Sequence, residues 1–178
     1  MKTAVFLPNW VGDAVMATPA LAAIRERCCD GEVVGILRPY VGEVLEGTGL
    51  VDRVIEWDRG AGRPDSSGWG LAKRLRAERF DVAVLMPGSL RSAWIAWLSG
   101  ARRRIGFSRD GRRFLLTDAV APRCRTTPHP ALDRYLRLAE AGGCEASNRQ
   151  MRLAVWKTDE ALGRAFRARQ GEVLGRRD

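Results

Sequence analysis

The feature that most constrains the fold of this chain is a regular alternation of short apolar segments with longer segments of helical periodicity. Strands are predicted at residues 3–8, 32–37, 53–57, 81–86, 104–107, 113–116 and 152–156. Helices are predicted at residues 13–29, 39–46, 71–79, 92–98, 130–141 and 158–170. Strands that alternate with helices indicate an α/β fold, in which helices sandwich a mostly parallel sheet.

The chain has 178 residues, which is enough for one domain with a substantial core. We expect residues 1–156 to form an α/β domain and residues 157–178 to form a helix or linker. Thr18-Pro19 has the pattern of a cap followed by a first-turn proline, so we expect the first helix to restart there. Trp94 and Trp97, spaced i, i+3 on a predicted helix, are expected to pack in the core.

The charge of the chain is basic and uneven. Lysine and arginine outnumber aspartate and glutamate by 30 to 21, a net charge of +9, and eight arginines but only Asp110 and Asp118 lie between residues 101 and 125. Such a patch attracts phosphate on a nucleic acid, a membrane surface or a small anionic substrate, and charge alone does not choose among them. Nucleic acid is disfavoured because no aromatic stacking platform is interleaved with the arginines and no helix-turn-helix or RNA-recognition signature is present.

The sequence shows no pattern typical of a metal or cofactor site, and we expect neither group. The four cysteines form no C-x-x-C pair and His129 is the only histidine, which disfavours zinc. Gly12 is the only glycine of the first loop, which disfavours an NAD-type enzyme with a G-x-G-x-x-G fingerprint. No apolar run reaches the roughly 18 residues that span a bilayer, and Pro8-Asn9 interrupts the first apolar segment, so we expect a cytoplasmic protein.

Ligands of parallel α/β sheets bind at the carboxyl ends of the strands, which selects the loops at residues 9–12, 87–91 and 106–113. The first loop joins a buried strand to a helix N-terminus, a natural anion site, and Asn9 and Gly12 are its candidate binding residues. Asp13 follows at or near the start of the helix. Two interpretations of Asp13 stay open: a helix cap, or a general base within hydrogen-bonding reach of a substrate hydroxyl.

The other two loops add polar and basic candidates. Ser89 or Ser92 either caps the next helix or contacts a ligand, and Arg91 is either a ligand contact or a solvated surface residue. Arg104 and Arg112 are candidates for binding phosphate or carboxylate, because a guanidinium group matches these anions bidentately. The alternative is a basic face that only keeps the protein soluble.

Four stretches of the sequence resemble ADP-heptose:lipopolysaccharide heptosyltransferases, most closely the heptosyltransferase II type. Residues 8–21, PNWVGDAVMATPAL, are similar to the family's opening P-N-W-I-G-D-x-V-M-x-T-P-A-L. Residues 86–93, MPGSLRSA, are similar to its L-P-N-S-x-R-S-A, and residues 103–117 to its R-R-I-G-Y, G-R and L-L-T elements. Residues 129–136 are similar to its H-x-x-x-R-Y-L helix. The matches follow the family order and cover roughly residues 1–156.

The resemblance implies the Rossmann-like N-terminal half of a GT-B glycosyltransferase, with residues 1–156 binding the acceptor. It implies transfer of heptose from ADP-heptose to the inner core of lipopolysaccharide with inversion, and Asp13 matches the family's catalytic base. The substrate-binding residues would be Asn9, Gly12, Ser89, Arg91, Arg104 and Arg112, with the arginines on the phosphate or acidic Kdo groups of the acceptor. It also implies peripheral contact with the inner face of the cytoplasmic membrane, no nucleic-acid partner and no metal.

The sequence departs from the family in two places. Gly88 stands where the family usually has asparagine, so one side-chain amide is missing. The phosphate-binding loop and following lysine of the family's second domain are not found in residues 1–178, so we expect this chain by itself to be inactive. The alternative that stays open is a non-catalytic anion- or nucleic-acid-binding α/β module, left after loss of the second domain.

Overall fold

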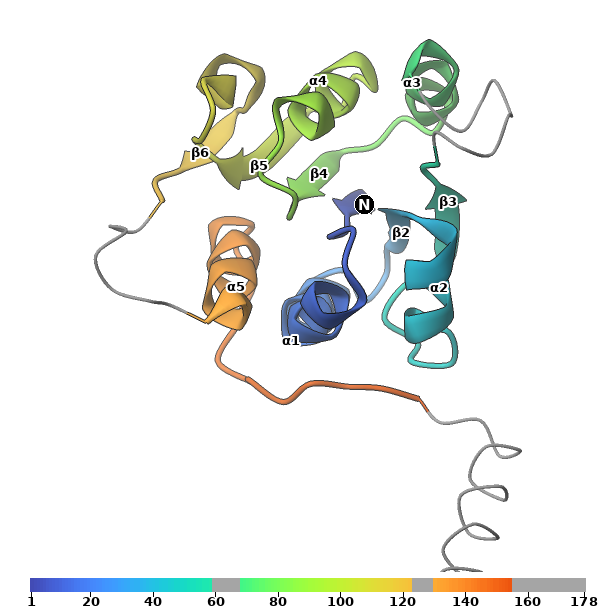
Figure 1. Cartoon of the computed structure of the whole chain (residues 1–178), viewed down its shortest axis with the longest axis vertical. Helices are drawn as coiled ribbons and strands as arrows, with labels where there is room; N and C mark the ends of the chain where they lie inside the picture. The colour runs from blue at the N-terminus through green and yellow to red at the C-terminus, as the bar shows by residue number, and fades with distance from the viewer. Residues whose placement is uncertain (59–67, 123–129, 155–178) are drawn as a thin grey trace, which may run out of the picture.

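A computed structural model describes residues 1–58, 68–122 and 130–154 (Figure 1). Its strands are β1 (Lys2–Phe6), β2 (Glu32–Leu37), β3 (Arg53–Glu56), β4 (Val82–Leu85), β5 (Arg103–Phe107) and β6 (Asp118–Val120). Its helices are α1 (Val11–Arg27), α2 (Pro39–Leu45), α3 (Gly68–Ala77), α4 (Leu90–Leu98) and α5 (Ala131–Ala141), with a 3-10 helix, η1 (Arg112–Leu115). The structure confirms the predicted α/β class.

The six strands form one parallel sheet in the order β3-β2-β1-β4-β5-β6. The chain builds outward from β1 to β3 and then crosses back, so that β4 pairs with the other side of β1. The strand order therefore reverses between β1 and β4. In open α/β sheets such a reversal leaves a crevice at the carboxyl ends of the strands, and ligands bind there.

Helices cover both faces of the sheet, which gives the molecule three layers (Figure 1). Helices α1, α2 and α5 pack on one face, and α3, α4 and η1 pack on the other. Val5 and Leu7 belong to the first core, Ala4 and Phe6 to the second, because successive strand side chains point to opposite faces. Burial on both faces explains why the strands are continuous apolar runs and do not alternate with polar residues.

Helix α1 runs without interruption through Pro19, so the expected restart at Thr18-Pro19 is wrong. Pro19 has no backbone N–H to donate to the carbonyl of Val15, four residues earlier. The hydroxyl of Thr18 donates to that carbonyl instead, at 2.7 Å. The acceptor is therefore satisfied, and the helix tolerates the proline.

The strand predicted at residues 113–116 is also wrong. This segment lies in η1 and the turn after it, and the last strand of the sheet, β6, begins only at Asp118. Gly111, with a φ of 71°, turns the chain ahead of η1. Leu115 and Leu116 are buried all the same, packed in the core under α4, so their apolar character reflects helix packing and not strand pairing.

The predicted strand at residues 152–156 does not form in its described part, residues 152–154. The backbone N–H of Arg152 donates to the Thr18 hydroxyl of α1 at 3.0 Å, so the chain lies along that helix and not in the sheet. The predicted helix at 158–170 and the predicted domain boundary at 156 lie outside the described residues.

Helix α4 turns its small residues toward the sheet and its tryptophans outward. Ala93 and Ala96 are buried, whereas Trp94 and Trp97 are 47% and 46% exposed. The prediction that these tryptophans pack in the core is therefore wrong. Small residues on the inner face let the helix approach the sheet closely, and the bulky apolar residues are left on the outer face.

Candidate active site

The carboxyl edge of the sheet brings the predicted ligand loops together. β1, β4 and β5 are neighbours, and Phe6, Leu85 and Gly106 are aligned across them. The β1–α1 loop, the β4–α4 loop and the turn between β5 and η1 therefore leave the sheet side by side. Because the strand order also reverses here, the geometry selects this edge as the candidate active site.

Asp13 lies in the first turn of α1, at this edge. Trp10 occupies the N-cap position, so the interpretation of Asp13 as the cap of the helix is wrong. Asp13 is half-buried, and a Cβ placed on the adjacent Gly12 would have no heavy atom within 4 Å. The space beside the first turn is thus open to a ligand.

Tyr135 of α5 is the neighbour of Asp13 that sequence reasoning did not single out. Its side chain is buried, and burial together with the charge of the Asp13 carboxylate raises the pKa of Tyr135 to about 12, against the smaller opposing effect of Arg134. The Arg134 guanidinium carbon lies 5.6 Å from the centre of the Tyr135 ring. Asp13 therefore stands beside a neutral hydroxyl. The signal was present in the sequence, in the resemblance of residues 129–136 to a family motif.

The β4–α4 loop is held by its own serines. Ser89 is the N-cap of α4, and its hydroxyl oxygen accepts from the backbone N–H of Ser92 at 3.2 Å, which confirms the capping interpretation. Gly88 has open space around it and Arg91, in the first turn of α4, is exposed. Within the described part of the chain no hydrogen bond or ion pair engages the Arg91 side chain, so its guanidinium is available to a ligand.

The β1–α1 loop exposes a second polar side chain. Asn9 is exposed, and its backbone carbonyl accepts from the hydroxyl of Tyr40 in α2 at 2.7 Å. The contact ties the loop to α2 through its backbone, so the Asn9 amide remains at the surface of the edge.

Arg112 departs from the role predicted for it, because its side chain is fully buried. Nε donates to the carbonyl of Phe107 at 2.8 Å, and Nη1 donates to the carbonyls of Pro87 and Ser89 at 2.7 and 2.9 Å. Nη1 also lies 3.2 Å from the hydroxyl of Ser92. The guanidinium thus ties the β5–η1 turn to the β4–α4 loop, and a ligand at the edge would contact that loop and not Arg112 itself.

Gly106 makes room for this arginine. A Cβ on Gly106 would lie 3.3 Å from Nη2 of Arg112 and 3.2 Å from Cδ2 of Leu116, both tight contacts. Nη2 is buried and has no hydrogen-bond partner among the described residues. Burial lowers the pKa of the Arg112 guanidinium. The carbonyl oxygens around Nε and Nη1 compensate for part of the cost of burying the cation.

Arg104 is not brought to the site either. It lies near the beginning of β5, three residues before Phe107 ends the strand. Its Nε donates to the carbonyl of Leu115 at 2.7 Å and its Nη1 to the carbonyl of Ala101 at 2.5 Å. The predicted substrate contact through Arg104 is therefore replaced by a brace between η1 and the beginning of β5.

The described residues offer neither a metal-ligand cluster nor a membrane span. In these ranges no group of three or more histidine, cysteine, aspartate and glutamate side chains is placed to hold a metal ion. None of the helices in the described ranges is both long and apolar enough to cross a bilayer.

The fold and the site together define a Rossmann-like α/β domain with one carboxylate in the first turn of α1, a buried tyrosine beside it and an exposed arginine in the first turn of α4. The chain belongs to glycosyltransferase family 9, the heptosyltransferases, whose family model matches residues 69–170. It is 27% identical over 141 residues to lipooligosaccharide heptosyltransferase 2 of Haemophilus influenzae, a match that covers 78% of this chain and 40% of that protein. The chain thus spans about 40% of the length of this curated relative.

Solved structures share the fold. The family 9 glycosyltransferase of Veillonella parvula aligns with a TM-score of 0.76 at 20% identity, over 96% of this chain and 49% of that chain. The ADP-heptose lipopolysaccharide heptosyltransferase II of Escherichia coli aligns with a TM-score of 0.72 at 24% identity, over 91% of this chain and 49% of that chain. The predicted Rossmann-like half of a GT-B glycosyltransferase is therefore confirmed as the fold.

Proposed function

We propose that residues 1–156 form the acceptor-binding part of an inverting heptosyltransferase, which transfers heptose from ADP-heptose to the inner core of lipopolysaccharide. One observation carries the proposal. Asp13 is a half-buried carboxylate in the first turn of α1, with open space at Gly12, on the edge where the strand order reverses. The substrates come from the family and from the names of the relatives, which act on lipopolysaccharide or lipooligosaccharide.

The chemistry needs one base. Asp13 takes the proton from a hydroxyl of the acceptor, and the freed oxygen attacks the anomeric carbon of ADP-heptose from the face opposite ADP. The bond to the diphosphate oxygen breaks and ADP leaves with the bonding electrons, which inverts the anomeric centre. ADP is a good leaving group, so no second carboxyl group is required to protonate it, in contrast to glycoside hydrolysis.

The surroundings of Asp13 support its role as a base. The Tyr135 hydroxyl beside Asp13 stays neutral, because the pKa of Tyr135 is raised to about 12. A general base needs both an accessible carboxylate and a fixed position. The open space at Gly12 supplies the first, and the packing of α1 against α5 supplies the second.

Arg91 is the residue we assign to the acidic groups of the acceptor, with Asn9, Gly12 and Ser89 as the remaining contacts; Ser89 caps α4 and is at the same time exposed at the edge. Arg91 is exposed in the first turn of α4, at the same edge of the sheet as Asp13, whereas Arg104 and Arg112 are occupied by backbone carbonyls. A guanidinium matches phosphate and carboxylate in a bidentate geometry. We propose that Arg112 acts on the acceptor only through the β4–α4 loop that it holds.

The test is acceptor-dependent release of ADP from ADP-heptose, measured in a form of the protein that includes the second half its relatives possess. We expect release only when acceptor is present. Residues 1–178 by themselves are expected to release none, because the groups that stabilise the departing diphosphate must be aimed at it from the other half. A folded form that binds both substrates and releases no ADP would contradict the proposal. Tight, strongly salt-dependent binding of nucleic acid would favour the non-catalytic alternative.

A further inference from the structure

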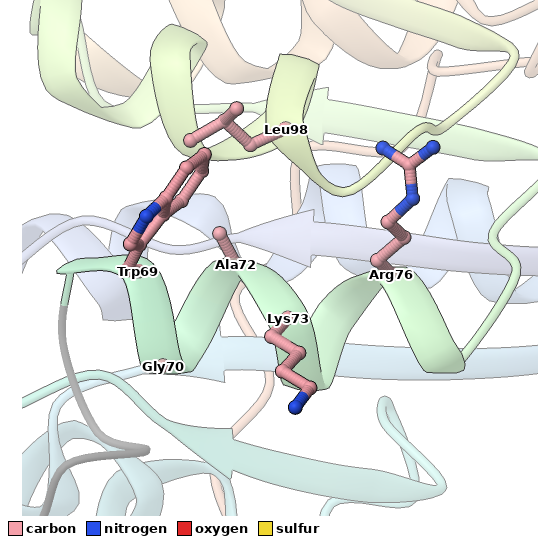
Figure 2. A pocket seen from close by; sticks show the side chains of 6 residues that line it. All are labelled: Trp69, Gly70, Ala72, Lys73, Arg76 and Leu98. Carbon is pink, nitrogen blue, oxygen red and sulfur yellow. The ribbon is translucent and has the colours of Figure 1, made fainter.

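The outer face of α3 and α4 carries an apolar groove that the proposed reaction does not use. The groove has a volume of about 390 Å³ and is lined by Trp69, Gly70, Ala72, Lys73, Arg76 and Leu98 (Figure 2). In Figure 2 the indole of Trp69 reaches across to Leu98 of α4, and Arg76 extends from α3 on the same side. The lining is apolar in the middle, and two cationic side chains stand on its α3 side.

The apolar surface continues along α4 toward the candidate active site. Leu90, Trp94 and Trp97 follow one another at i, i+4 and i+7, a single helical stripe, and each is close to half exposed. The rings of Trp94 and Trp97 lie 5.4 Å apart, and Leu98, four residues after Trp94, joins the stripe to the groove. Trp69 is 75% exposed. Contiguous exposed apolar surface of this kind marks an interaction site.

The charge of the same face is positive. Residues 68–80 contain four basic residues and a single acid, Glu78, and helix α4 contains no acid at all. Glu78 is held by Lys2 and Arg53, each at 2.6 Å, so its charge is already compensated from within the protein. Lys73 and Arg76 are exposed beside the groove. The face thus combines exposed tryptophan and leucine with an excess of positive charge.

We propose that the outer face of α3 and α4 docks the protein onto the surface of an anionic lipid bilayer. Tryptophan favours the boundary between headgroups and acyl chains, and lysine and arginine favour anionic headgroups. The apolar part and the basic part of this surface therefore both match the headgroup region of an anionic bilayer. A second copy of the chain would bring two positive faces together, which disfavours that occupant. A nucleic acid would leave the leucines and the apolar groove without a partner.

The stripe of Leu90, Trp94 and Trp97 begins beside the β4–α4 loop of the candidate active site. Leu90 is the first residue of α4 and directly follows the Ser89 cap of the β4–α4 loop. A bilayer on this face would therefore lie next to the candidate active site, where a lipid-anchored acceptor could reach Asp13. This last step rests on the proposed function, whereas bilayer docking itself does not.

The experiment is co-sedimentation of the 178-residue chain with vesicles of phosphatidylcholine alone or with about 30% phosphatidylglycerol. We expect binding to the anionic vesicles to be at least about tenfold tighter, since each basic residue at the surface adds roughly a fivefold factor. Trp94→Ala with Trp97→Ala should weaken that binding at least about tenfold, and so should Lys73→Glu with Arg76→Glu. All four positions are exposed, so the midpoint of thermal unfolding should change little. An unchanged midpoint shows that the variants are folded.

Matched controls come from the opposite face of the sheet. Met151→Ala removes a half-exposed apolar side chain beside α1, and Arg27→Glu reverses an exposed charge at the end of α1. Both should bind vesicles as the parent chain does. Equal binding to both vesicle types, undiminished binding by the two test variants, or equal losses in the controls would each overturn the proposal.

A second measurement separates this proposal from the proposed function. In the longer form of the protein that serves to test the proposed function, transfer to a deacylated, lipid-free acceptor should be the same with and without the α3–α4 substitutions. Loss of that soluble reaction in the Trp94→Ala, Trp97→Ala variant would overturn the docking role, because the surface would then belong to the active site. Vesicle binding that persists in a protein without transferase activity would uphold the docking surface and count only against the proposed function.

Discussion

The two ends of the ligand edge use their charged side chains differently. At the β1–α1 end, beside Asp13, a Cβ on Gly12 would meet no heavy atom within 4 Å, and Trp10 is exposed. At the β5–η1 end, Arg112 is fully buried against three carbonyl oxygens. Both regions follow strands that end at the same edge of the sheet, and both carry residues that match family motifs. The β1–α1 end leaves its charged side chain open to solvent and ligand, and the β5–η1 end uses its charged side chain inside the protein.

The difference teaches that a matched motif does not say whether a charged side chain contacts a ligand or supports the residues that do. Arg91 and Arg112 both come from such motifs, yet only Arg91 is exposed. A buried guanidinium must satisfy its N–H groups within the protein, and the carbonyls of Pro87 and Ser89 do this for Arg112. We therefore expect substitutions at the open end to change activity, and substitutions at the buried end to change stability first.

The largest effect is expected for Asp13→Asn. Loss of the general base should lower kcat about 10²–10⁴-fold, with binding of ADP-heptose retained, because the substitution keeps the shape of the side chain and removes its basicity. Steady-state transfer kinetics in an active form of the protein measure this. Asp30→Asn, an exposed carboxylate beyond the other end of α1, serves as the control and should leave kcat unchanged. A kcat for Asp13→Asn within about threefold of the parent protein would end the assignment.

Arg112→Leu is expected to lower the free energy of unfolding by about 3–5 kcal/mol, because carbonyl groups that the guanidinium satisfies would remain buried without donors. Arg112→Lys should recover only part of this loss, since an ammonium group cannot reach all of these oxygens in the geometry of a planar guanidinium.

Urea unfolding of the 178-residue chain measures the difference. Arg113→Leu is the matched control, because Arg113 is the next residue and is exposed, and it should change stability by less than about 0.5 kcal/mol. Equal unfolding midpoints for Arg112→Leu and Arg113→Leu would remove the contrast between the two ends of the edge.

Arg91→Ala should act in the opposite way, on the acceptor and not on the fold. One charge-assisted hydrogen-bonding group is worth roughly 1.5–3 kcal/mol, so the acceptor KM should rise roughly 10- to 100-fold with a smaller effect on the KM for ADP-heptose. Arg91→Lys should restore part of the affinity. If Arg91 and the exposed Arg113 gave equal, small and strongly salt-dependent losses, the arginines would form a general basic face instead.

The smallest effect is a pH dependence set by the tyrosine beside Asp13. The pKa of Tyr135 is raised to about 12 in the folded protein, whereas an unfolded tyrosine ionises near pH 10. Above about pH 10 the unfolded chain loses a proton that the folded chain keeps, so stability should fall by about 1.4 kcal/mol per pH unit until the pKa of about 12 is reached. Below about pH 10 the contribution of this group to stability is constant.

Urea unfolding between about pH 9 and 11 tests this dependence. Tyr135→Phe should flatten the fall in stability, and Tyr40→Phe, at the exposed tyrosine of α2, should not. Asp13→Asn should flatten it in part, because the carboxylate is, after burial, the next cause that raises the pKa of Tyr135. A pH dependence unchanged by Tyr135→Phe would mean that the pKa of Tyr135 is not raised in the folded protein, and one flattened by Tyr135→Phe but not by Asp13→Asn would mean that the carboxylate and the tyrosine are not coupled.

Local patterns in the sequence were sufficient for the first five strands of the sheet, the five α-helices of the described residues and the first loop of the site, but not for β6. Burial of the strands on both faces leaves continuous apolar runs, and a helix on each face leaves its own periodicity, so both can be recognised without any tertiary contact. The position of Asp13 also follows from local information, because a loop between a buried strand and a helix must lie at the carboxyl edge of a parallel sheet.

Only the tertiary structure decided what the other charged and aromatic residues do. Arg112 is buried by a loop about 20 residues earlier in the chain, and Tyr135 meets Asp13 because α5 packs on α1. Trp94 and Trp97 face outward because smaller residues of α4 fit more closely against the sheet. The helical spacing of the tryptophans is the same whether they lie in the core or on the surface, and the arginine content is the same whether the arginines bind a ligand or brace the protein. The choice between core and surface, or between ligand and brace, depends on which distant groups fill the space around each side chain, and that is decided only when the layers pack together.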